Sequence, residues 1–184
     1  MSYKVPLATT TDFGIVKIGS GLSVTNGTVS AAATVMNYGF FTSTTTQTNP
    51  VANAINLITY DTTGPINGIS VVGGNAITVV NAGTYTKMFA VMTDNTASGT
   101  HIISFWLRLN GVDVVGSRQD LEVLNTASLS FTSDNFTLAI PAGGNIQMCW
   151  SSADNTAILI ALPVAVIPTR PTGFSVKLTL TRIG

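Results

Sequence analysis

The chain has 184 residues, eight basic and eight acidic side chains, zero formal net charge and only 9% charged residues, against about 25% in ordinary soluble domains. It lacks the basic stripe that would neutralise phosphates, so nucleic-acid binding is not expected. The mean hydropathy of +0.42 is high, but no run of about 18 apolar residues predicts a transmembrane helix, and no basic amphipathic helix predicts membrane binding.

Residues 1–33 differ from the remainder of the chain. Short apolar runs at Gly14–Ile18, Leu22–Thr25 and Thr28–Val29 are separated by Gly-Ser-Gly and by Asn26-Gly27, which is a strong hairpin signal. Strands this short and this few cannot close a core alone. We therefore predict a β-hairpin appendage to which several chains contribute strands. The first residues lack an apolar signal-peptide core, so synthesis in the cytoplasm without a secretion signal is expected.

Residues 34–184 predict about ten antiparallel strands and no helix. Turns or loops are predicted at 47–53, 62–67, 94–100 and 141–144, and three prolines at 163–171 predict a crossing without strands. The candidate segments for these strands are 35–45, 55–60, 68–72, 76–80, 84–93, 101–109, 112–116, 120–124, 129–132, 135–140, 145–151, 157–162 and 174–182. Such a pattern is typical of a sandwich, a jelly roll or a barrel.

The clearest local signals are His101–Gly116 and Phe174–Arg182. In the first, Ile103, Phe105, Leu107 and Leu109 alternate on one strand face before the Asn110-Gly111 turn. In the second, Phe174, Val176, Leu178 and Leu180 are predicted to face inward.

Two stretches resemble known families. The text ATTTDFGIVKIGSGLSVTNGTVS resembles a short β-motif of phage tail and head fibre proteins. Asn81–Tyr85, Trp106–Gly111 and Ile140–Gly144 resemble the tumour-necrosis-factor-like, complement-type jelly roll; Asn145 stands where that family often has an acidic residue. Variants with the WLRxNG turn are common in phage and large-virus structural proteins.

These resemblances imply a function in assembly. The second implies a compact homotrimer whose inner sheets pack on the threefold axis. Together they imply a virion structural protein, a capsid decoration or fibre protein, attached to other capsid or tail proteins through residues 1–33 and able to contact a host-surface glycan. A carbohydrate-binding module on the same jelly roll is the alternative.

Two surface predictions follow. Met88, Ala90 and Met92 share the strand face opposite Tyr85, Phe89 and Val91, which suggests a second apolar surface and a trimer interface. The alternative is a strand that is buried on both sides within one chain. Tyr60, Trp106 and Arg108 are the candidate ligand platform, because aromatic side chains can stack on sugars.

No enzyme, cofactor or metal is predicted. The single histidine, His101, lies near Ser104 without any signature of a nucleophile with its base, and one histidine cannot supply a zinc site. Cys149 lies between Met148 and Trp150, which predicts a buried, inert thiol. The eight carboxylates form no calcium-loop pattern, and a hydrolase would need some of them clustered across strands.

Overall fold

The computed structural model describes residues 22–25, 28–31, 36–124 and 129–184. The chain separates into two compact units, Met1–Val35 and Met36–Gly184. In the first unit, β1 (Leu22–Thr25) pairs with β2 (Thr28–Ala31) from Leu22 opposite Ala31 to Thr25 opposite Thr28. The predicted hairpin is therefore confirmed, while the strand predicted at Gly14–Ile18 lies outside the described residues.

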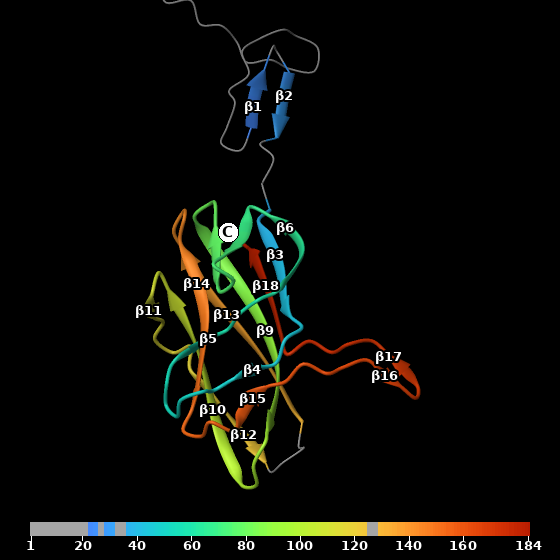
Figure 1. Cartoon of the computed structure of the whole chain (residues 1–184). Coiled ribbons are helices and arrows are strands. Elements are labelled where there is room, and N and C mark those ends of the chain that lie inside the picture. Colours follow the sequence, from blue (N-terminus) through green and yellow to red (C-terminus); the bar gives the residue numbers. More distant parts are fainter. Residues whose placement is uncertain (1–21, 26–27, 32–35, 125–128) are drawn as a thin grey trace, which may run out of the picture. The chain divides into compact units, whose positions relative to one another are not determined.

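The second unit consists of two seven-stranded antiparallel sheets and a small separate hairpin (Figure 1). The first sheet has the order β4 (Gln47–Thr48), β15 (Ala157–Leu159), β9 (Gly83–Asn95), β18 (Val176–Arg182), β3 (Tyr38–Ser43), β6 (Thr62–Asn67), with β13 (Ser130–Ile140) also paired to β9. The second has the order β11 (Val112–Asp113), β10 (Thr100–Leu109), β14 (Asn145–Ser152), β8 (Ala76–Val79), β7 (Ile69–Val72), with β12 (Gln119–Leu124) on β10 and β5 (Asn56–Leu57) on β14.

The path of the chain between the sheets makes this a jelly roll. After β3 in the first sheet, β7 and β8 lie in the second and β9 returns to the first. Strands β10 and β12 lie in the second sheet, β13 in the first, β14 in the second and β18 in the first. The predicted all-β jelly-roll sandwich is confirmed. The described residues form no helix, and so none that could cross a membrane.

The core lies between the inner faces of the two sheets. On β9, Tyr85, Phe89 and Val91 are buried, as the period-2 alternation predicted. The Phe89 ring meets Phe105 of β10 across the sheets, with ring centroids 5.8 Å apart. Each sheet therefore has one face in the core and one face directed outward, and the outward faces are where function must be sought.

Several predicted elements were wrong, and the loop predicted at 47–53 begins with the short strand β4. Residues 62–67 form strand β6 rather than a turn, since Pro65 lies on an edge strand, where a missing amide hydrogen is tolerated. The strands predicted at 129–132 and 135–140 are one strand, because β13 pairs with β9 without a break from Ser130 to Ile140.

The proline-rich segment also differs from its prediction. Instead of a plain crossing, it forms a short hairpin of β16 (Ala165–Val166) and β17 (Thr169–Arg170), closed at its base by the Leu162–Gly173 bridge. Each strand is only two residues long, so no proline has to donate within a longer ladder. We call residues 163–172 the arm.

Candidate functional site

The outward face of the first sheet carries the predicted interface residues. Met88 is 61% exposed, and Ala90 and Met92 are half-buried on the same side of β9. Phe131 of β13 lies directly opposite Met92 in the ladder and is 66% exposed. We call Met88, Ala90, Met92 and Phe131 the apolar face. Phe131 was missed as a site residue, because only the pairing of β13 with β9 places it beside Met92.

Two shallow hollows mark this face. One, of about 320 Å³, lies between Phe40 of β3, Met88 and Ala90, and the other, of about 270 Å³, between Met92 and Phe131. Lys177 of β18 borders both, and its ammonium group lies 5.0 Å from the centre of the Phe174 ring. Phe174 was predicted to face inward, and this was wrong: it precedes β18, which begins at Val176, and lines the second hollow, while Ser175 is buried. Side chains of a partner packed on this face could fill the two hollows.

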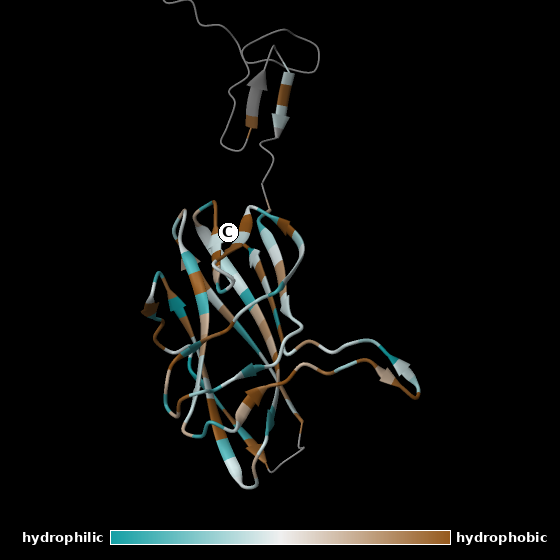
Figure 2. Cartoon of the chain, in the orientation of Figure 1, coloured by the Kyte–Doolittle hydropathy of each residue, from teal (hydrophilic) through white to brown (hydrophobic). Residues whose placement is uncertain are grey.

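The arm is a second apolar element without a partner among the described residues. It projects from the body of the unit (Figures 1 and 2), with Val166 81% exposed and Ile167 89% exposed at its tip. Its base is continuous with the apolar face, because Pro171 lines the same hollow as Met92 and Phe131. The arm and the face therefore form one connected apolar region.

The outward face of the second sheet has a different chemistry. Trp106 and Arg108 project there from β10, as predicted, and both donate hydrogen bonds to Asp113: Trp106 Nε1 at 2.9 Å and Arg108 Nε at 2.6 Å. The Arg108 hydrogen bond, followed by that of Trp106, lowers the pKa of the Asp113 carboxyl below its usual range. Asp113 was not among the predicted site residues, although its position just after the Asn110-Gly111 turn places it beside β10.

Tyr60 does not belong to this platform, which corrects the prediction. Its side chain is buried in the core against Phe41, with ring centroids 6.2 Å apart. Burial strongly raises the pKa of the Tyr60 hydroxyl. Ile58 and Tyr60 lie on the same side of this segment and are both buried, whereas Thr59 between them is exposed, so Tyr60 belongs to the core side.

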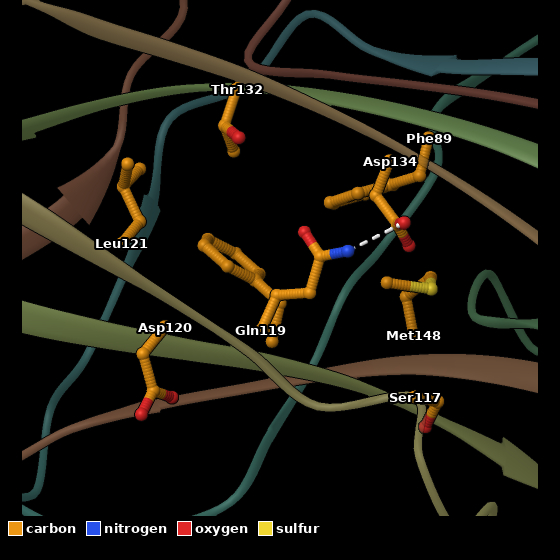
Figure 3. Close-up of a pocket in the computed structure, with 9 residues that line it drawn as sticks. Phe89, Ser117, Gln119, Asp120, Leu121, Thr132, Asp134 and Met148 are labelled. Carbon is orange, nitrogen blue, oxygen red and sulfur yellow. Dashed lines mark hydrogen bonds between the residues drawn. The ribbon is translucent and has the colours of Figure 1, made fainter.

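A small hollow lies between β12 and β13, where the exposed Gln119 faces Asp134 (Figure 3). The Gln119 amide donates to the Asp134 carboxylate at 2.6 Å, and the buried Lys87 ammonium donates to the other carboxylate oxygen. Burial lowers the pKa of Lys87, although the Asp134 hydrogen bond opposes that shift. The hollow, of about 20 Å³, has room for no more than one water molecule. The group is thus a structural link between sheets and leaves no room for a ligand.

The residues most often used in catalysis have structural partners here. His101 Nδ1 lies 2.8 Å from Asp154 Oδ2, while Ser104 donates to Asp120 at 2.7 Å instead of to the histidine. Cys149 is buried, and burial raises the pKa of its thiol to about 11. Within the described part of the chain, no three His, Cys, Asp or Glu side chains are grouped as a metal ion would need.

Comparisons with known proteins give a similarity in fold only. No family model and no curated protein matches the chain. Two crystal structures of murine APRIL, at pH 8.5 and at pH 5.0, are similar at 10% and 8% sequence identity, with TM-scores of 0.47 and 0.46. Each covers 80% of this chain and 99% of the APRIL chain. The fold assignment rests on the strand order of the chain itself.

Proposed function

We propose that this chain is a non-enzymatic structural protein that assembles as a homotrimer in a virion, as a capsid decoration or fibre protein. The observation that carries the proposal is the apolar face on β9 and β13. Large exposed apolar patches usually mark interaction surfaces, since each costs free energy while it stays in water. Met88 and Phe131 belong to this face and are each more than half exposed.

The partner that the properties of the chain support is another copy of the same chain. Because the chain carries few charges, little electrostatic repulsion opposes contact between identical copies at the apolar face and the arm. An arm that leaves one protomer and a face beside its base suit a head-to-tail contact, in which each copy gives one surface and receives the other. Contacts of this kind close into rings when the rotation between neighbours permits. Three copies is the number implied by the resemblance to the tumour-necrosis-factor-like jelly roll.

The N-terminal unit supports attachment to a larger particle. Its hairpin has four residues per strand, and Leu22 and Val29 are exposed. A hairpin of this size cannot bury these side chains within one chain. Together with the similarity of residues 1–33 to phage fibre motifs, this supports their role in joining chains and in binding other virion proteins.

The test is the mass of the protein in solution. We expect light scattering coupled to size-exclusion chromatography to give a trimer, and M88D or F131D to raise its dissociation constant by about 100-fold or more, since a charge would be buried without a partner. Ile102 provides the matched control, because it is also more than half exposed and lies on β10, on the outward face of the other sheet. I102D should leave the trimer intact. A wild-type protein that is monomeric at micromolar concentration would refute the assembly.

A further inference from the structure

A hollow of about 480 Å³ lies on the outward face of the second sheet, a volume within the usual range for small-molecule sites. Its lining includes Ser104 and Trp106 of β10 and Ser151 of β14. Two loops border it: one carries Asn53 and Ile55 ahead of β5, and the other is Val114–Gly116 after β11. The hollow is therefore built by three separate parts of the chain around an aromatic side chain.

The Trp106 ring is held in place by its own chain. Its only hydrogen-bond donor, the indole N–H, is already bonded to Asp113, which Arg108 also fixes. A ligand would therefore meet the ring as an apolar surface rather than as a donor. Ile55 and Val115, both exposed, extend that apolar surface along the two bordering loops.

The charges around the hollow are balanced. Arg108 pairs with Asp113, and Arg118 pairs with Asp120 through two hydrogen bonds of 2.9 and 2.7 Å. An anionic or cationic ligand would have to compete with one of these pairs. A neutral ligand would not, and the carboxylate of Asp113 still has oxygens free to accept from hydroxyl groups because a carboxylate has about four acceptor positions.

We infer that this hollow binds a neutral saccharide. One face of a pyranose ring is made of C–H groups and can pack on Trp106, while its edge carries hydroxyl groups for Ser104, Ser151 and Asp113. This inference goes beyond the structural role proposed above. It is independent of the homotrimer, because the hollow lies on the sheet that does not carry the apolar face.

The test uses tryptophan fluorescence, which here reports on the site. The chain has two tryptophans, and Trp150 is buried in the core, so a ligand-dependent change arises at Trp106. The probes are the methyl glycosides of glucose, galactose, mannose and N-acetylglucosamine, with sialyllactose as an anionic probe. We expect a saturable change with at least one neutral glycoside, weaker by tenfold or more with the anionic probe.

Two variants check the location of the site. Saturation-transfer NMR of the bound glycoside should show about tenfold weaker binding by W106A, the loss expected from removing one aromatic stacking contact. S151L places a larger side chain in the hollow from the outward face of β14 and should abolish binding, and it keeps the inference testable if W106A does not fold. No saturable response to any neutral glycoside, tighter binding of sialyllactose, or unchanged binding by folded W106A and S151L would each overturn the inference. Since M88D and F131D act on the other sheet, they should leave glycoside binding unchanged even if they abolish the trimer.

Discussion

The outward faces of the two sheets belong to the same sandwich but have opposite chemistry. On the first sheet, Met88, Ala90, Met92 and Phe131 leave apolar surface exposed. On the second, Arg108 and Asp113 form an ion pair beside Trp106 and border a hollow. The difference teaches that strand alternation only divides residues into inward and outward. The function of an outward face depends on its side chains. Polar groups can already be hydrogen-bonded within the chain, whereas exposed apolar groups are buried only when a partner binds.

The largest expected effect comes from the inner side of the first sheet. D134A would leave the Lys87 ammonium, 1% exposed, without its partner, and we expect a loss of about 3–5 kcal/mol of folding free energy. Urea denaturation measures it. The double variant K87M/D134L, which replaces both charges by apolar groups, should recover most of the loss. A loss below about 1 kcal/mol would show that the pair does not hold β9 and β13 together.

The pH dependence of D134A has a definite sign. The pKa of Lys87 is lowered by burial in the folded protein, whereas the unfolded chain has the ordinary value of 10.5. Without Asp134 the folded pKa falls further, so the unfolded state binds more protons over the interval between the two values. The stability of D134A should therefore rise as the pH increases through that interval, whereas the double variant should show no such rise.

A smaller effect separates the arm from the apolar face. V166S/I167S removes apolar surface at the tip of the arm, far from any core contact. If the arm covers a neighbouring copy, the trimer should dissociate about tenfold more readily, which corresponds to about 1.4 kcal/mol. Thermal unfolding of the second unit should not change by more than a degree or two. An unchanged trimer would assign the contact to the apolar face alone and leave the arm for another partner.

The smallest effect tests the carboxylates of the second sheet. The pKa values of Asp113 and Asp120 are lowered, chiefly by hydrogen bonds from Arg108 and Arg118. Their contribution is therefore complete above the ordinary value of 3.8 and is lost as the pH falls through the lowered pKa values. Trp106 should become more mobile in that acid range, seen as a fall in fluorescence anisotropy. D113N should show that mobility already at neutral pH; an identical pH profile in D113N would mean that Asp113 does not hold the ring.

The sequence predicted the fold class well, because alternation is local. The buried Val176, Leu178 and Leu180 of β18, and the left-handed backbone of Asn110 and Gly111 in the tight turn, follow from residues that are neighbours in the chain. The outward placement of Met88 on β9 follows for the same reason.

Other features could not be predicted from short stretches of the sequence. Lys87 lies on the buried face of β9, and only its pairing with Asp134, 47 positions away, explains why a lysine can be buried there. Tyr60 was predicted as a surface aromatic, but it shares its side of the segment with the fully buried Ile58, and packing against the core decides which side faces inward.

By itself, the sequence determined that the chain is all-β with short turns and two kinds of strand face, since backbone geometry and hydrophobic alternation act over a few residues. Only the tertiary structure decided that the arm joins the apolar face and that Asn53, Trp106 and Ser151 share one hollow. Such sites depend on strand register and on which strands become neighbours, and these are settled by packing across the whole core.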